Sequence, residues 1–217
     1  MKPYKCLFVD WHLTLSNALF WEQFSDPTHP QHPLFAFMQS TLFAPAGVKT
    51  WVLPWMRGEF TSEEVLAEVC RGTAFDSTFA LRALQSSCQQ MRLVSEAIPR
   101  YVAGLQAKGL QVVIATDNMD TFHRWTVPSL RLRALFDDIL CSFEQQALKI
   151  DADQRGQSRF FADYLCAHHL GWGESLLLDD GDEDYGSIIR QFGIEYQAIE
   201  PGKGLVPALQ GLLASFP

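Results

Sequence analysis

Short apolar runs that alternate with helix-like segments constrain the fold of this chain more than any other feature. The runs are CLFVD (6–10), LQVVIAT (110–116), FDDILCS (136–142), SLLLDD (175–180) and IEYQAIE (194–200). Each has the length and composition that predict a buried strand. Segments with helical spacing lie between the later runs, at 119–127, 159–170 and 185–193. This alternation predicts an α/β protein whose mostly parallel sheet carries helices on both faces.

Proline and glycine indicate where two of these helices begin and end. Pro99 suits the first turn of a helix that precedes the run at 110–116, and Gly109 suits its C-terminal end. Pro128 is expected to end the helix over 119–127, because a proline inside a helix removes a backbone donor. A last helix is expected to close the chain after residue 205.

The stretch from residue 16 to about residue 94 has a different character. It contains no strong strand pattern, and three prolines in residues 26–33 predict a loop there. Thr61 and Glu64 have the spacing of a capping box at the start of an amphipathic helix. A second helical face is expected from the residues Leu81, Leu84, Cys88 and Met91. The sequence therefore predicts a mainly helical insertion between the first strand and the rest of the sheet.

Polar residues stand at the carboxyl ends of four predicted strands. They are Asp10, Thr116, Ser142 and the pair Asp179 and Asp180. Sites in open parallel sheets lie beyond the carboxyl ends of the strands, so we expect these side chains to converge on one edge. A carboxylate such as Asp10 can act as a nucleophile if its charge is neutralised.

The acidic run over residues 179–184 offers a means of neutralisation. Carboxylate oxygens in a small cluster suit Mg²⁺, which prefers oxygen ligands and shares them with substrate phosphate. Such a metal would offset the repulsion between an anionic nucleophile and a phosphoryl group. Lys149, seven residues after Ser142, could supply a further positive charge at the same edge.

Four segments, in this order, resemble the motifs of the haloacid dehalogenase (HAD) superfamily, whose members are mostly phosphatases. They are FVDWHLT with Asp10, VVIATDN with Thr116, SFEQQALK with Ser142, Glu144 and Lys149, and LLLDDGDED with Asp180 and Asp184. Gln146 stands where the third motif has glycine. The resemblance covers nearly the whole chain. It implies a Rossmann-like core over 1–15 and 95–217, with a helical cap over 16–94.

The resemblance also implies a reaction, a cofactor and roles for individual residues. It implies a Mg²⁺-dependent phosphatase that forms an aspartyl-phosphate on Asp10 and acts on a small phosphorylated metabolite. Thr116 and Lys149 would hold the phosphoryl oxygens, and Asn118 would either join them or cap the following helix. The metal ligands would be Asp10, the backbone carbonyl of His12, Asp180 and Asp184.

One residue departs from the family pattern. His12 occupies the position of the second aspartate of D-x-D-x-T, which in the phosphatases protonates the leaving alcohol and activates water. Histidine can transfer protons near neutral pH. The departure keeps other interpretations open: a catalytically weak binding or regulatory protein, or a hydrolase of C–halogen or C–P bonds. The acidic fourth motif argues against a metal-free dehalogenase, and Lys49 is the only cap lysine available for a C–P hydrolase.

Net charge and cysteine content limit the partners and the cellular compartment that the sequence predicts. The formal net charge of −8 argues against binding to nucleic acid or to an anionic membrane surface. Five cysteines, without a metal-binding spacing, predict free thiols in the cytoplasm rather than a disulfide framework. No apolar run approaches 18 residues, so we expect a soluble protein, either a monomer or a homodimer.

Overall fold

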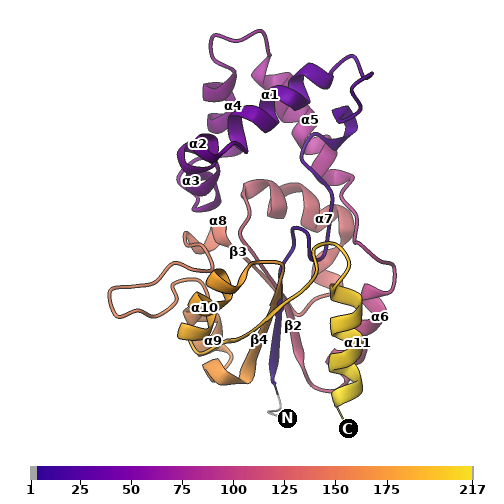
Figure 1. The fold of residues 1–217 in the computed structure, drawn as a ribbon, viewed down its shortest axis with the longest axis vertical. Coiled ribbons are helices and arrows are strands. Elements are labelled where there is room, and N and C mark those ends of the chain that lie inside the picture. The colour runs from indigo at the N-terminus through magenta and orange to yellow at the C-terminus, as the bar shows by residue number, and fades with distance from the viewer. Residues whose placement is uncertain (1–3, 217) are drawn as a thin grey trace.

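The computed structural model describes residues 4–216, which form a five-stranded sheet covered by helices and surmounted by a helical layer (Figure 1). The strands are β1 (Cys6–Val9), β2 (Gln111–Thr116), β3 (Asp138–Cys141), β4 (Ser175–Asp179) and β5 (Glu195–Ala198). Their order is β3-β2-β1-β4-β5, and every neighbouring pair is parallel. All five predicted strands are confirmed, and β1 lies in the middle of the sheet.

Helices cover both faces of the sheet, as predicted. Helices α6 (Ile98–Ala107) and α11 (Leu205–Ser215) lie on one side, and α9 (Ala162–Ala167) and α10 (Glu183–Gln191) lie on the other (Figure 1). Alternate side chains of β1 enter separate apolar clusters, with Leu7 on one face and Phe8 on the other. Burial on both faces is the reason that the strands are continuous apolar runs.

The insertion between β1 and α6 is helical throughout its regular structure. It contains η1 (Glu22–Phe24), α1 (His32–Leu42), α2 (Pro45–Gly47), η2 (Val48–Val52), α3 (Leu53–Met56), α4 (Ser62–Cys70) and α5 (Ser77–Gln89). Figure 1 shows these elements as a layer beyond the carboxyl ends of the strands. We call this layer the cap. The boundaries 1–15, 16–94 and 95–217 stay predictions, and residues 1–3 and 217 lie outside the described part of the chain.

The predicted capping box at the start of α4 is confirmed. The Thr61 backbone N–H donates to Glu64 Oε2 at 2.8 Å, and the Glu64 backbone N–H donates to Thr61 Oγ1 at 3.4 Å. These reciprocal bonds satisfy donors that the first helical turn leaves free.

Of two predictions based on proline, the loop over 26–33 is confirmed only for residues 26–31, and the helix end at Pro128 is wrong. The loop predicted over residues 26–33 ends early, because α1 begins at His32 and places Pro33 in its first turn. A proline there removes only an N–H that lacks a helical partner anyway. Pro128 does not end the preceding helix, because it lies in the first turn of α7 (Val127–Leu130).

A π-helical turn leads directly into the helix that contains Pro128. In η3 (Phe122–Thr126), the Val127 N–H donates to the Phe122 carbonyl, five residues back. The change of hydrogen-bond register lets a new helix segment start at Val127, so Pro128 falls in a first turn. The same arrangement occurs in the cap, where η2 precedes α3 and Pro54. Proline here marks a junction between helical segments.

Three short helical elements remain in the described part of the chain, namely η4 (Leu132–Ala134), α8 (Ser142–Gln145) and η5 (Trp172–Glu174). The cysteines are free thiols, as predicted; four are buried, and only Cys166 is exposed. Within residues 4–216 no helix has the length and hydropathy needed to cross a bilayer.

Candidate active site

Asp10 follows β1 directly and lies at the carboxyl edge of the sheet. Its backbone N–H donates to the Leu178 carbonyl at 3.0 Å, so the pairing of β1 with β4 continues into this residue. Asp10 is only 5% exposed. The sheet therefore fixes the carboxylate, and this explains why a charged residue can end a buried strand.

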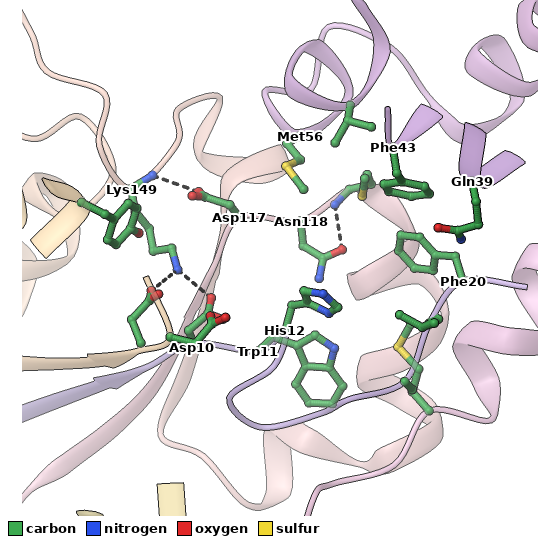
Figure 2. A pocket seen from close by; sticks show the side chains of 18 residues that line it. Asp10, Trp11, His12, Phe20, Gln39, Phe43, Met56, Asp117, Asn118 and Lys149 are labelled. Carbon is green, nitrogen blue, oxygen red and sulfur yellow. Dashed lines mark hydrogen bonds and ion pairs between the residues drawn. The ribbon is translucent and has the colours of Figure 1, made fainter. Parts of the chain in front are cut away.

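Lys149 is the cationic partner of this carboxylate. Its Nζ donates to Asp10 Oδ1 and to Asp179 Oδ2, each at 2.6 Å, and the residue is 3% exposed. Its backbone N–H donates to Asp117 Oδ1 at 2.9 Å, which fixes the loop that carries it (Figure 2). The predicted approach of Lys149 to Asp10 is thus observed across 139 positions of sequence.

The charges of this group oppose one another at short range. Burial raises the pKa of Asp10 to about 7; the positive charge of Lys149 opposes this rise and the negative charge of Asp179 adds to it. Burial alone would lower the pKa of Lys149, but Asp10 and Asp179 outweigh it and raise that pKa well above its ordinary value. Lys149 is therefore a permanent cation here.

A third carboxylate makes the group a candidate metal centre. Asp10, Asp179 and Asp180 each offer an oxygen, and these oxygens lie within 4.8 Å of one another. Burial and the neighbouring Asp179 raise the pKa of Asp180. Three close carboxylates with one ammonium group leave negative charge uncompensated, and oxygen-only donors suit Mg²⁺. The residues present therefore fit a divalent cation.

The other predicted metal ligands differ in their surroundings. The turn after β1 is closed by the Leu13 N–H donating to the Ser16 carbonyl and by the Leu15 and Ser16 N–H groups donating to the Trp11 carbonyl. None of these bonds uses the His12 carbonyl. Asp184 is exposed in the first turn of α10 and lies outside the carboxylate cluster. Its predicted role as a ligand therefore has no support in the geometry.

His12 lies beside the carboxylates and lines the same cavity as Asp10 (Figure 2). Its side chain is exposed to that cavity. The surrounding protein lowers the pKa of His12 by desolvation, and the charge of Asp180 acts in the opposite direction. The next residue, Leu13, has φ of 54°, in the left-handed region, where the chain turns sharply away from the sheet.

The segment after β2 supplies the predicted phosphate-binding residues. The Thr116 hydroxyl is buried and has no hydrogen-bond partner, although Thr116 does not line the cavity. Asn118 does line it, and its Oδ1 accepts from the Met119 N–H at 2.9 Å. The Ser142 hydroxyl accepts from the Asn118 N–H at 2.9 Å and donates to the Asn118 carbonyl at 3.0 Å. Asn118 therefore caps the following segment and keeps its side-chain NH₂ available.

Gln146, which replaces the glycine of the family motif, has φ of 50°. It is the residue that ends α8, and its conformation is one that glycine adopts without a steric cost. The chain therefore retains the backbone path that brings Lys149 to Asp10 despite the substitution.

A cavity of about 440 Å³ extends from these residues toward the cap. Figure 2 shows Lys149, Asp10 and Asp117 at one side of it and Phe20, Phe43 and Gln39 at the other. The cap tryptophans Trp21 and Trp55 are fully buried and do not line it, so they belong to the core.

Buried hydrogen bonds join the cap to the sheet domain around Asp120. Asp120 Oδ1 accepts from Trp55 Nε1 at 2.8 Å and from Ser62 Oγ at 2.6 Å. Arg124 Nη1 pairs with Asp120 Oδ2 at 2.6 Å and also contacts Glu63 of the cap. These contacts hold the cap over the cavity in this structure.

A second connection lies nearer to Lys149. Arg57 of the cap donates to Asp151 through Nε and Nη2, at 2.8 and 2.9 Å. Hydrogen bonding from Arg57 lowers the pKa of Asp151. Asp151 also accepts from the Leu148 N–H at 2.9 Å, so the cap contacts the same loop that presents Lys149.

Sequence reasoning missed Asp117 and gave Asp179 too small a role. Asp117 follows Thr116 immediately, so its position directly after a strand was a usable signal. The sequence placed Asp179 only among the polar residues at the strand ends, but it is 4% exposed, pairs with Lys149 and belongs to the carboxylate cluster. The role of Asp120 could not be predicted from its neighbours in the sequence, because its partners Trp55 and Ser62 lie far from it along the chain.

Several solved structures share this fold along nearly the whole chain. A predicted HAD-like family hydrolase from Porphyromonas gingivalis superposes with a TM-score of 0.68 at 16% identity, covering 97% of this chain and 98% of its own. A HAD family enzyme from Bacteroides thetaiotaomicron, in complex with magnesium and inorganic phosphate, gives 0.65 at 14% identity, covering 94% and 98%. L-2-haloacid dehalogenase from Xanthobacter autotrophicus gives 0.63 at 14% identity, covering 90% and 77%.

No protein-family model and no curated protein matches the sequence. The similarity therefore lies in the fold: a parallel five-stranded sheet with an inserted helical cap. That fold is shared with the two HAD hydrolases and with the L-2-haloacid dehalogenase. The chain has the fold of the HAD-like hydrolases.

Proposed function

We propose that this protein is a Mg²⁺-dependent phosphatase that acts on a small phosphorylated substrate through an aspartyl-phosphate on Asp10. The observation that carries the proposal is the ion-paired group of Asp10, Lys149 and Asp179 at the carboxyl edge of the sheet, with Asp180 beside it. The structurally similar enzyme from B. thetaiotaomicron, solved with magnesium and inorganic phosphate, supports the same chemistry. A carboxylate, a fixed cation and a carboxylate cluster are the groups that phosphoryl transfer to an aspartate requires.

In the first step an oxygen of Asp10 attacks phosphorus, and the bond from phosphorus to the alcohol oxygen breaks. Lys149 and the Asn118 NH₂ line the cavity and would stabilise the phosphoryl oxygens. In the second step water attacks phosphorus, releases inorganic phosphate and regenerates the Asp10 carboxylate. His12 is the side chain beside Asp10 that can give a proton to the leaving alcohol and take one from the attacking water.

Asp10, Asp180 and the backbone carbonyl of His12 would hold Mg²⁺, with Asp179 next to them. When bound, the metal supplies positive charge that reduces repulsion between the Asp10 carboxylate and the phosphoryl group. In the free protein Lys149 supplies positive charge to the same region, since Asp10 and Asp179 raise its pKa well above its ordinary value.

The proposal is tested by phosphate release from p-nitrophenyl phosphate and a panel of phosphate monoesters, with Mg²⁺ and with EDTA. The wild type, Asp10→Asn and His12→Asp are compared. We expect Mg²⁺-dependent turnover by the wild type and none by Asp10→Asn. If no substrate is hydrolysed in a reaction that requires both Mg²⁺ and Asp10, the phosphatase assignment is wrong.

The same experiment separates the other interpretations. A gain of activity in His12→Asp over a nearly inactive wild type would favour a binding or regulatory protein that has lost its proton-transfer residue. Halide release from 2-chloropropionate in EDTA would favour the chemistry named for the X. autotrophicus relative. The carboxylates Asp179 and Asp180 argue against that outcome, because they would place further negative charge beside a carboxylate nucleophile in a metal-free site.

A further inference from the structure

The cavity of the candidate active site changes character along its length. All of its charged side chains lie at the sheet end, where four aspartates and Lys149 meet. The cap contributes only uncharged groups, chiefly Phe20, Phe43, Val52 and Met56, and the single amide of Gln39. Since the phosphoryl group would occupy the charged end, the cap end would receive the alcohol part of the substrate.

From this division we infer that the substrate is the phosphate monoester of a largely apolar, uncharged alcohol that carries at most one neutral polar group toward Gln39. The inference rests on the proposed function, because that function decides which end of the cavity receives the phosphate. It adds a class of substrate, selected by hydrophobic contact with the cap.

Hydrophobic contact is available on several sides of the cap end. Val52 is buried at 3% exposure, and Phe20 and Phe43 approach each other with ring centroids 6.3 Å apart. Met91 and Met119, both buried, add flexible apolar surface from outside the cap helices. An apolar chain that enters this space leaves water and contacts carbon and sulfur atoms, which stabilises its binding.

The electrostatics of the cavity exclude a second anionic group on the substrate. Among the described residues that line the cavity, Lys149 is the only lysine or arginine, and Asp10 and Asp179 already pair with it. A carboxylate or second phosphate at the cap end would lose its hydration without a cationic partner. Phosphorylated sugar acids and bisphosphates are therefore poor substrates in this interpretation.

Gln39 is positioned to recognise one neutral polar group. It lies on α1 at the side of the cavity away from Lys149, near Phe43 (Figure 2). Within residues 4–216 the Gln39 side chain makes no hydrogen bond to another residue. An amide offers both a donor and an acceptor, so a hydroxyl or carbonyl group of the substrate could bind there.

The test measures binding directly, so that it does not depend on turnover. Ethyl-, butyl- and hexylphosphonate are titrated into the wild-type protein by calorimetry in the presence of Mg²⁺, together with 6-phosphonohexanoate, the charged counterpart of the hexyl compound. We expect affinity to rise about threefold to fourfold per methylene group. We expect 6-phosphonohexanoate to bind at least about tenfold more weakly than hexylphosphonate.

Two variants connect the expected preference to the cap. Val52→Thr replaces one methyl group by a hydroxyl of similar size, so it should reduce the gain per methylene, and circular dichroism checks that the cap stays folded. Gln39→Lys should reverse the discrimination against 6-phosphonohexanoate. Gln31→Lys, the same substitution at an exposed position that does not line the cavity, is the matched control and should leave the selectivity unchanged.

The outcomes separate this inference from the proposed function. Equal affinities along the alkyl series, or tighter binding of 6-phosphonohexanoate by the wild type, would overturn the apolar substrate class even if the protein hydrolyses phosphate esters. A rising series that Val52→Thr weakens, in a protein without any phosphatase activity, would support the apolar ligand class and reject the proposed reaction.

Discussion

Asp10 and Lys149, at the sheet end of the cavity, are held by ion pairs, whereas Phe43 and Gln39, at the cap end, depend on the packing of α1. At the sheet end, Asp10 and Asp179 are buried, and both pair with the buried ammonium group of Lys149. The cap end has apolar walls and an amide without a protein partner. The ion-paired groups at the sheet end are therefore fixed by one another, whereas the walls of the cap end belong to a separate helical layer.

Replacing Asp10 gives the largest expected effect and tests whether the sheet end carries the chemistry. Asp10→Asn removes the nucleophile but retains an oxygen that can accept from Lys149, which also keeps Asp179 as a partner. We expect the rate of phosphate release to fall by at least about 10⁴-fold. Circular dichroism should show an unchanged fold.

The matched control for this variant is Asp163→Asn, at an exposed position on α9. Its activity should stay within about twofold of the wild type. If Asp10→Asn retained even a tenth of the activity, the reaction would not proceed through this carboxylate. The sheet end of the cavity would then not carry the chemistry as proposed.

Lys149→Met should cause the next largest effect, this time on stability. The substitution leaves Asp10 and Asp179 buried together without their cation, and breaking a buried ion pair in this way costs about 3–5 kcal/mol. The free energy of unfolding is measured in urea with EDTA present, so that no metal replaces the lost charge.

Lys203→Met provides the comparison, because the Lys203 side chain is 78% exposed and its pair with Glu200 lies on the surface. Its effect should stay below about 0.5 kcal/mol. Equal stability losses in the two variants would show that the charged end of the cavity does not depend on Lys149.

Local signals explain why the sheet end could be predicted from the sequence. Asp10, Thr116 and Asp180 each follow an apolar run, and parallel topology brings the ends of such runs together. Lys149 was found through its spacing from Ser142. The same logic applied to the residue after Thr116 would have found Asp117.

The cap end could not be predicted in the same way. The residues that line it, such as Gln39, Phe43 and Met56, belong to short helices and turns whose mutual packing has no signature in sequence spacing. The prediction for Pro128 was wrong for a related reason. Whether a proline ends a helix or starts a new helical segment depends on a π-helical turn before it. Helix content was predictable, but the orientation of each helix was not.

Asp120→Ala tests which contacts attach the cap to the sheet domain. It leaves the Trp55 indole N–H and the Ser62 hydroxyl buried without an acceptor, which costs about 1–3 kcal/mol. Arg57→Ala removes a partly exposed ion pair with Asp151 and should cost about 0.5–1 kcal/mol. Urea unfolding of both variants gives the comparison. A larger loss in Arg57→Ala would show that the cap is attached mainly at the Lys149 loop.

The stabilisation of the wild type by Mg²⁺ should be smaller than the loss in Lys149→Met, and it depends on the carboxylate cluster. At a free Mg²⁺ concentration ten times the Kd, binding should add about 1.4 kcal/mol to the free energy of unfolding, and EDTA should remove this gain. Asp180→Asn should abolish it, because Asp180 belongs to the cluster. Asp184→Asn should retain it, because Asp184 is exposed on α10 outside the cluster. If Asp184→Asn lost the gain as Asp180→Asn does, the ligand set implied by the sequence motif would be right and the grouping of Asp10, Asp179 and Asp180 incomplete.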